Sequence, residues 1–170
     1  LLSLYGILDW RSVPEMPVEI VLLPSWFPFH LSKVSYWART VLVPLLVLQA
    51  LRPRAKNPLG VRIDELFVEP PATIGPVPKA PHQRWSWFLF FRGIDAVLRP
   101  AVKLFPKSLR QRAINKAVEF VTERLNGQDG LGAIFPAMAN ATLMYDVLGD
   151  TANAAIARAS CGLLAMPLCG

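Results

Sequence analysis

The side chains that most often carry out chemistry in proteins are few in this sequence and stand apart from one another. Its two histidines, His30 and His82, have no partner at a spacing that would build a metal site or an acid–base pair. His30 is therefore expected to cap a helix or to lie satisfied in the core. The carboxylates Asp64, Glu65 and Asp129 fall in segments typical of loops. We predict no catalytic residue, no metal and no cofactor in this chain.

The two cysteines, Cys161 and Cys169, lie close to the end of the sequence. Two cysteines do not make a disulfide framework, and no pair of histidines accompanies them to complete a metal site. We therefore expect a reducing compartment and assign neither cysteine a function.

The chain is basic and apolar at once. It has a formal net charge of +6, with 53% hydrophobic and 18% charged residues. The basic residues form two clusters, Arg52, Arg54, Lys56 and Arg62, and then Arg99, Lys103, Lys107, Arg110, Arg112 and Lys116. Such clusters suit anionic lipid head groups or nucleic-acid phosphates, and they also occur on solvated helix faces. The prolines and the lack of spaced aromatic residues argue against a base-stacking platform, so no nucleic-acid partner is expected.

An aromatic block lies between the two clusters. Residues 85–91 read Trp-Ser-Trp-Phe-Leu-Phe-Phe, which places apolar side chains almost all round a helix. With Arg84, Arg92 and Arg99 beside it, the block is typical of a helix in a membrane interface, and the alternative is a central core helix. The predicted membrane-contact residues are Trp85, Trp87, Phe88, Phe90 and Phe91. The longest apolar runs are too short to span a bilayer, so we expect a surface-seated protein.

The elements that must position these residues are nearly all helical, and we predict an all-α fold. A short apolar helix should end at Leu23, and a long one should cover residues 31–51 with a kink at Pro44. Residues 52–81 are rich in proline and predict an extended loop. The next helix should cover residues 84–105.

Three further helices are expected in the last third of the chain. The first should begin at a Ser108 cap, stop at Asn126 and Gly127, and bury Leu109, Ala113, Ala117, Phe120 and Val121. The second should cover residues 133–148, with Pro136 in its first turn. Asp150 and Thr151 should open the last. Residues 1–5 read as the middle of a helix with no signal peptide, so we expect a fragment of a longer protein.

Several stretches resemble one family of proteins, in sequence and in order. Residues 35–40 read Ser-Tyr-Trp-Ala-Arg-Thr, and residues 132–138 read Gly-Ala-Ile-Phe-Pro-Ala-Met. Further matching stretches are residues 4–14, 17–20, 26–30 and 62–67. Residues 118–132 resemble a degenerate copy of a repeat whose glutamine and tryptophan tie neighbouring helices, with Leu125 and Leu131 at those two positions. On these residues the chain resembles the non-catalytic barrel of the squalene–hopene cyclases.

The resemblance implies part of an α–α barrel, incomplete in this chain. It implies that Trp37, Ile134 and Pro136 line a substrate cavity, with Phe135 between the last two. Arg39 is expected to be a structural ion-pair or hydrogen-bond partner instead. Val34 and Leu42 match positions near a narrow channel between the membrane and the cavity.

The chemistry that such residues would serve is the cyclisation of a polyene. It needs an acid that protonates a terminal double bond, aromatic faces that stabilise carbocations, and a dry pocket that holds the folded chain. In the family the acid is the central aspartate of an Asp-x-Asp-Asp motif, which does not occur here. The chain would therefore supply the cavity wall and a membrane-docking surface, and it would be inactive alone.

The resemblance also implies partners and a location. The substrate would be squalene, and the partners would be a lipid surface and the catalytic barrel of the same protein, with a homodimer of the complete enzyme also allowed. The location would be the cytoplasmic side of a bacterial cytoplasmic membrane. The alternative is a non-enzymatic membrane-surface module. We expect the barrel to cover residues 1–158 and residues 159–170 to be a divergent tail, and we expect the isolated chain to aggregate or to be molten.

Overall fold

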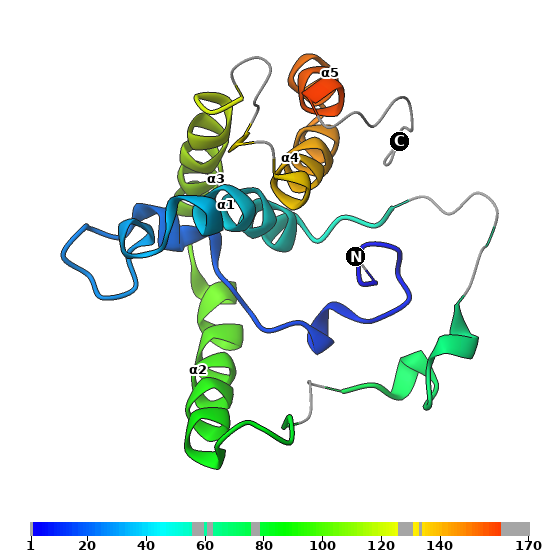
Figure 1. Cartoon of the computed structure of the whole chain (residues 1–170). Helices are drawn as coiled ribbons and strands as arrows, with labels where there is room; N and C mark the ends of the chain where they lie inside the picture. Colours follow the sequence, from blue (N-terminus) through cyan, green and yellow to red (C-terminus); the bar gives the residue numbers. More distant parts are fainter. Residues whose placement is uncertain are drawn as a thin grey trace. The chain divides into compact units, whose positions relative to one another are not determined.

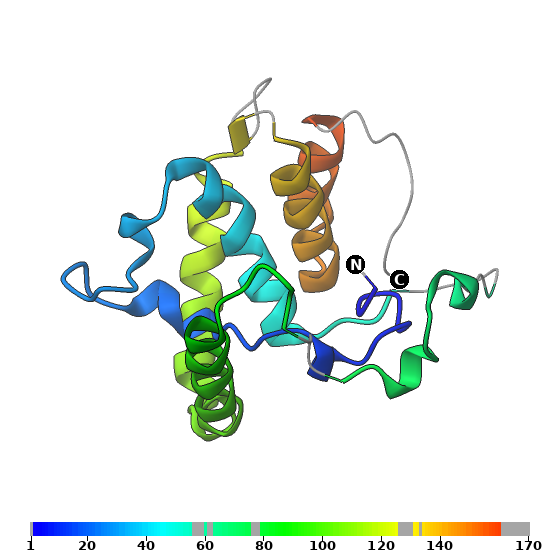
Figure 2. The same ribbon diagram turned by 60° about the horizontal axis from the view of Figure 1, so that its bottom comes forward.

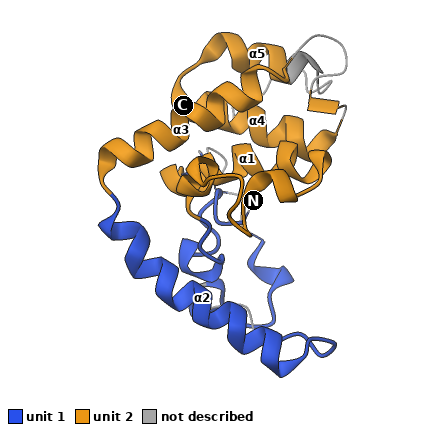
Figure 3. Cartoon of the chain, turned by 90° about the vertical axis from the view of Figure 1, so that its left-hand side faces the viewer, with its two compact units in different colours: residues 1–16, 54–105 blue, residues 17–53, 106–170 orange. Residues whose placement is uncertain are grey.

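The structure, a computed structural model, describes residues 2–55, 60, 63–75, 79–125, 131–132 and 134–160. Within these residues every regular element is a helix, which confirms the all-α prediction. The chain divides into two compact units (Figure 3). Unit 1 contains residues 1–16 and 54–105, and unit 2 contains residues 17–53 and 106–170.

Unit 2 is a cluster of four α-helices. They are α1 (Tyr36–Leu51), α3 (Lys107–Thr122), α4 (Phe135–Leu148) and α5 (Thr151–Ser160). Helix α1 lies between α3 and α4, and α5 packs against α4 (Figures 1 and 2). The core contains Val43, Leu46, Val47, Ala117, Val121, Ala141, Met144 and Tyr145, all nearly inaccessible to solvent. Burial of these apolar side chains is the main force that holds the four helices together.

The long helix predicted for residues 31–51 is divided in two. A 3₁₀ turn, η3 (Leu31–Lys33), comes first, and α1 begins only at Tyr36. The Ser35 hydroxyl accepts a hydrogen bond from the Ala38 amide at 3.3 Å, which caps α1 and separates it from η3. Pro44 lies inside α1 and is buried. The short apolar helix predicted up to Leu23 is the 3₁₀ helix η2 (Val18–Leu22), which packs on α3.

Helix α3 differs from its prediction at its first turn. Its N-cap is Pro106 and no side chain caps it, so the expected Ser108 cap is wrong; Ser108 lies inside the helix. The buried residues are Ala113, Ile114, Ala117 and Val121, whereas Leu109 and Phe120 are only half-buried. The expected stop at residues 126–127 lies outside the described residues.

Helices α4 and α5 follow the sequence closely. Pro136 lies in the first turn of α4, as predicted, although the helix begins at Phe135 instead of residue 133. Helix α4 ends at Gly149, whose φ of 77° favours glycine. The Asp150 carboxylate then accepts hydrogen bonds from the Asn153 amide at 3.1 Å and the Asn153 side chain at 2.8 Å, which opens α5.

Unit 1 contains one long helix, α2 (Trp85–Leu104), and three 3₁₀ turns, η1 (Trp10–Ser12), η4 (Asp64–Leu66) and η5 (Pro71–Thr73). The described part of the predicted loop over residues 52–81 contains no other helix beyond these turns. The helix expected over residues 1–5 is wrong, because residues 2–6 form turns. The turn closes through a hydrogen bond from the Gly6 amide to the Ser3 carbonyl at 3.2 Å, and the φ of Gly6 is 70°.

Candidate functional site

The predicted cavity residue Trp37 lies in the first turn of α1, and its indole ring packs against the backbone of Gly132. The contact is so close that a Cβ atom added to Gly132 would overlap Trp37 Cζ3. Gly132 has a φ of 75°, a conformation that other residues seldom adopt. The Trp37 side chain is nevertheless 54% exposed. The ring therefore contacts Gly132 and, edge-on, the Tyr36 ring at 5.6 Å between centroids, while about half of the residue stays exposed.

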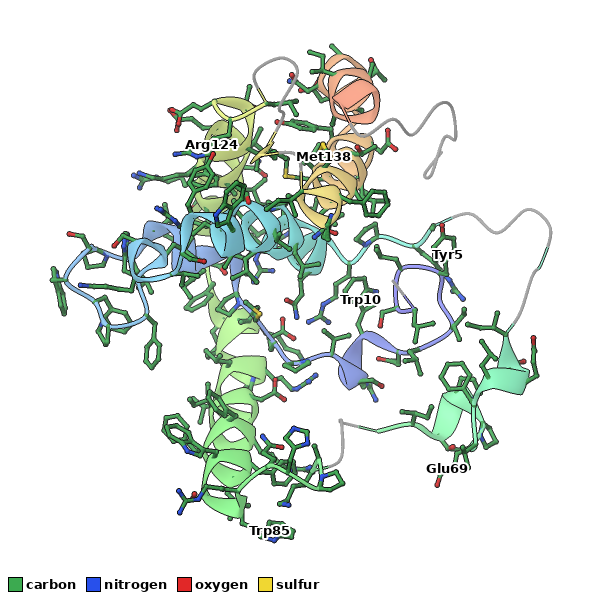
Figure 4. All side chains as sticks on the ribbon, in the orientation of Figure 1. Tyr5, Trp10, Glu69, Trp85, Arg124 and Met138 are labelled. Carbon is green, nitrogen blue, oxygen red and sulfur yellow. The ribbon has the colours of Figure 1, made fainter. Side chains whose placement is uncertain are left out.

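Residues 134–136 come from the beginning of α4, two residues after Gly132. Ile134 is the N-cap residue, and its carbonyl accepts hydrogen bonds from the amides of Ala137 and Met138 at 3.0 and 3.1 Å. Phe135 is 58% exposed and Pro136 is exposed, whereas Ile134 is half-buried. Met138, one turn further on, faces the interior of unit 2 with 6% exposure (Figure 4).

Packing between α1 and α4 holds Trp37 close to residues 134–136. The two helices pack against each other, and the Asn140 side-chain amide donates to the Val41 carbonyl at 3.3 Å. The Thr40 hydroxyl is buried and donates to the Trp37 carbonyl at 2.8 Å, which ties down the first turn of α1. The structure thus brings Trp37 close to the segment that carries Ile134, Phe135 and Pro136.

The two predicted channel residues flank Trp37 along the chain. Val34 follows η3, and its amide donates to the Leu31 carbonyl at 3.1 Å. Leu42 lies in the second turn of α1, and both side chains are half-buried. His30 caps η3 as expected: its Nδ1 accepts from the Ser32 amide at 3.0 Å.

The structure bears on the Arg39 expectation at one atom only. Arg39 was expected to be an ion-pair or hydrogen-bond partner, but its Nε atom is buried and has no hydrogen-bond partner among the described residues. The expectation is therefore not met at this atom.

At the two positions of the degenerate repeat, buried leucine side chains take the place of the glutamine and the tryptophan. Leu125 and Leu131, which stand at the glutamine and tryptophan positions, are 8% and 1% exposed. The Leu131 amide donates to the Arg124 carbonyl at 3.1 Å. Residues 126–130, which include Asp129, lie outside the described residues. Arg124, at the end of α3 in Figure 4, lies with its guanidinium 3.7 Å from the centre of the Phe120 ring.

One buried polar contact that sequence reasoning missed connects α3 to α4. The Thr122 and Tyr145 hydroxyls lie 2.9 Å apart, and Tyr145 is fully buried. Burial raises the pKa of the Tyr145 phenol above its ordinary value. The phenol therefore stays protonated at neutral pH and acts as a structural hydrogen-bonding group.

One cavity among the described residues of unit 2 does not coincide with the predicted site. It is an open groove of about 680 Å³ along α3, with Ile114, Val118 and Leu148 as apolar lining and Glu119, Glu123 and Asp150 as acidic lining. None of the predicted cavity or channel residues lines it.

The predicted membrane-contact residues occupy the first turns of α2, and none of the residues in this helix is buried. Trp85, Trp87, Phe90 and Phe91 are 50–67% exposed, and Phe88 is half-buried. The rings support one another: Trp87 stacks on Phe91 with centroids 5.8 Å apart, and Trp85 meets Phe88 edge-on at 5.9 Å. Trp85 projects beyond the end of the helix (Figure 4).

Cations border this aromatic cluster. Lys79 Nζ lies 5.2 Å from the centre of the Trp85 ring, and the Arg92 guanidinium lies 5.8 Å from that of Phe88. Two charged side chains further along α2 hold the helix to the N-terminal segment of unit 1. Asp95 accepts from the Glu15 amide at 2.7 Å and from Arg99 Nε at 2.6 Å, and Arg99 donates to the Val13 carbonyl at 2.8 Å. In the part of the chain that the structure describes, no helix is long and apolar enough to cross a membrane.

Comparison with known proteins places this helical arrangement among the triterpene cyclases. The family model of the squalene–hopene cyclase N-terminal domain matches residues 1–166. The chain belongs to the squalene–hopene cyclase family, and its all-helical fold is part of an α–α barrel.

This chain matches one part of each relative. It is 60% identical over 153 residues to the squalene–hopene cyclase of Bradyrhizobium diazoefficiens, covering 90% of this chain and 23% of the relative. It is 62% identical over 149 residues to a probable squalene–hopene cyclase of Sinorhizobium fredii, with 88% and 23% covered. For the squalene–hopene cyclase of Zymomonas mobilis the identity is 52% over 152 residues, with 89% and 22% covered. The chain thus spans less than a quarter of these relatives.

Proposed function

We propose that this chain forms one wall of the substrate cavity, and part of the membrane-docking surface, of a squalene–hopene cyclase. The observation that carries the proposal is the contact of Trp37 with Gly132, while 54% of the residue remains exposed. A core tryptophan would be covered on both faces. A half-open aromatic ring beside the start of α4 suits a wall that faces a substrate.

The chemistry follows from what these side chains can and cannot do. Trp37 offers a π-face that stabilises a passing carbocation by about 0.5–2 kcal/mol. Ile134 and Pro136 offer apolar shape that keeps water away and holds the folded polyene near its reactive geometry. None of them can donate the initiating proton, so the acid belongs to the catalytic barrel of the complete protein. Val34 and Leu42 border the route by which squalene enters.

Helix α2 is proposed as the membrane-docking element. Its exposed Trp and Phe rings suit the boundary between head groups and acyl chains, and Lys79 and Arg92 beside them suit anionic head groups. The protein would lie on the cytoplasmic face of a bacterial cytoplasmic membrane without crossing it. A homodimer of the complete enzyme is compatible with this arrangement.

The test uses the Bradyrhizobium diazoefficiens relative with its matching segment exchanged for the part of this chain that aligns with it over 153 residues. We call it the cyclase chimera. Trp37→Ala and Ile134→Ala should change the ratio of cyclised products made from squalene, while binding to lipid vesicles stays unchanged. Ile156→Ala, on the exposed side of α5, is the matched control and should leave the products as they are. Unchanged products from both cavity variants would contradict the proposal.

A second candidate function is a non-enzymatic membrane-surface module. The exposed aromatic rings of α2 favour this module as much as they favour the cyclase, but the two candidates predict different results for the variants. For the module, Trp85→Ser with Trp87→Ser abolishes vesicle binding, and no substitution at Trp37 or Ile134 affects any product. The chimera experiment therefore separates the two candidates directly.

A further inference from the structure

A second exposed aromatic cluster lies in unit 2, far along the chain from α2. The aromatic loop, residues 24–30, joins η2 to η3 and projects from the helices of unit 2 in both views (Figures 1 and 2). Trp26 is 78% exposed and Phe29 is 60% exposed. Phe27 is half-buried between them, with ring centroids 5.9 Å from Trp26 and 6.1 Å from Phe29. We propose that the aromatic loop is a lipid-inserting anchor, separate from α2.

Four residues of the aromatic loop have no free amide hydrogen to lose to an apolar surrounding. Pro24 and Pro28 have no amide hydrogen to satisfy. The Phe27 amide donates to the Pro24 carbonyl at 2.9 Å, and the His30 amide donates to the Phe27 carbonyl at 3.0 Å. Two consecutive turns therefore satisfy the Phe27 and His30 amides internally. Each amide left unsatisfied in hydrocarbon would oppose insertion by roughly several kcal/mol.

The amides at the start of η3 are also hydrogen-bonded within the chain. The Ser32 amide donates to His30 Nδ1 at 3.0 Å, and the Lys33 amide donates to the His30 carbonyl at 2.9 Å. The side chain of Lys33 itself is exposed. A cation next to exposed Trp and Phe rings is the combination that anionic phospholipid surfaces attract, and the net charge of +6 has the sign that such a surface requires.

The chemistry of the loop favours lipid over a protein partner. Proline-bounded turns present the two large side chains at the tip of a short projection and offer no groove or free strand edge, as a peptide or helix partner would need. The lipid surface is also the partner proposed for α2, so this inference rests on that part of the proposed function. The two anchors lie in different units and can be tested separately.

The experiment measures partition of the cyclase chimera onto vesicles of equal parts phosphatidylcholine and phosphatidylglycerol. Trp26→Ser combined with Phe29→Ser should lower the partition coefficient by about tenfold or more, because two large apolar side chains no longer leave water. Leu66→Ser is the control, since Leu66 is 74% exposed and lies in η4, outside the aromatic loop. It should leave partition unchanged.

A second readout keeps the proposal testable if the double variant folds poorly. Trp26→Phe keeps an apolar ring and should bind vesicles as the parent does, while the quenching of tryptophan emission by brominated lipids falls. Unchanged quenching would show that Trp26 stays outside the bilayer. Protection of Trp26 from acrylamide without lipid would show that the remainder of the protein covers the loop. Dissociation of a dimer by the double variant, with vesicle partition unchanged, would show that a second copy covers it. Each of these three results overturns the proposal.

The same assay distinguishes this inference from the docking role of α2. Loss of partition only on substitution of the aromatic loop would reject α2 as an anchor and retain the loop. Loss only on substitution of Trp85 and Trp87 would retain α2 and reject the loop. If both anchors insert, each substitution lowers the partition coefficient, and the two together lower it further.

Discussion

At the scale of single residues, Gly132 determines where the Trp37 ring lies. A side chain at residue 132 must adopt an unfavourable φ and also displace the indole. We expect Gly132→Ala to lower the free energy of unfolding by about 1–3 kcal/mol and to change the emission of Trp37. Urea unfolding of the cyclase chimera measures the first effect, and its product ratio measures the consequence for the cavity.

Gly149 provides the matched control for that prediction. Its φ is 77°, close to that of Gly132, but no atom lies within 4 Å of the position that its Cβ would take. Gly149→Ala therefore introduces the backbone strain without the steric clash. Equal destabilisation and equal product ratios for the two variants would show that the contact between Gly132 and Trp37 has no energetic role.

A second prediction at this scale concerns the cap of α5. Hydrogen bonds from the Asn153 side chain and backbone hold the pKa of the Asp150 carboxyl below its ordinary value of 3.8. The carboxylate therefore stabilises the folded state fully above that ordinary value, and this contribution is lost as the pH falls through the lowered pKa. Asp150→Ala should lower stability by about 1 kcal/mol at pH 7, and the difference from the parent should shrink at acidic pH. Unfolding curves of the parent and the variant at pH 7 and at acidic pH measure this difference. Asp150→Asn can still cap α5, so it should lose less stability than Asp150→Ala.

At the scale of elements, two charged residues of α2 hold the helix to the N-terminal segment of unit 1. Asp95 and Arg99 together bind the backbone of Val13 and Glu15. Asp95→Ala removes the acceptor for the Glu15 amide and the ion pair with Arg99. We expect hydrogen exchange at the Glu15 amide to become about tenfold faster.

The control for this prediction is on the same helix. Lys103 is exposed in the last turn of α2, so Lys103→Ala removes a charge without touching the bound segment. Unchanged exchange at Glu15 in Asp95→Ala, or an equal change in Lys103→Ala, would contradict the role assigned to Asp95.

At the scale of the whole molecule, the isolated chain exposes many large apolar side chains. Trp26, Phe29, Trp85 and Leu104 are all at least 60% exposed. The chain also spans less than a quarter of its relatives, in which further sequence accompanies it. We expect the isolated chain to bind a hydrophobic dye and to self-associate in sedimentation experiments. A soluble monomer with one sharp thermal transition and no dye binding would contradict this prediction.

The sequence by itself determined the helical class, the family and the position of most helices. Pro136 and Asp150 act locally, through a missing amide and a side-chain cap, so the starts of α4 and α5 could be predicted from them. The aromatic composition of residues 85–91 likewise indicated a surface helix before its exposure was known. The predicted cavity, channel and membrane roles and the residue-159 boundary remain predictions.

Local signals failed where a competing contact decided the outcome. Ser108 can cap a helix, but Pro106 already fixes the extended backbone before α3, and the helix begins one residue before the serine. The helix expected at residues 1–5 gives way to a turn closed by Gly6.

Only the tertiary structure decided what lies against what. The seat of Trp37 on Gly132, the bond between Thr122 and Tyr145 and the hold of Asp95 on Glu15 join residues between 23 and 95 positions apart. No periodicity or propensity encodes such pairs, because each depends on how separate helices pack in space. Local backbone preferences therefore explain where the helices begin and end, and packing between distant segments explains why the Trp37 ring lies against Gly132.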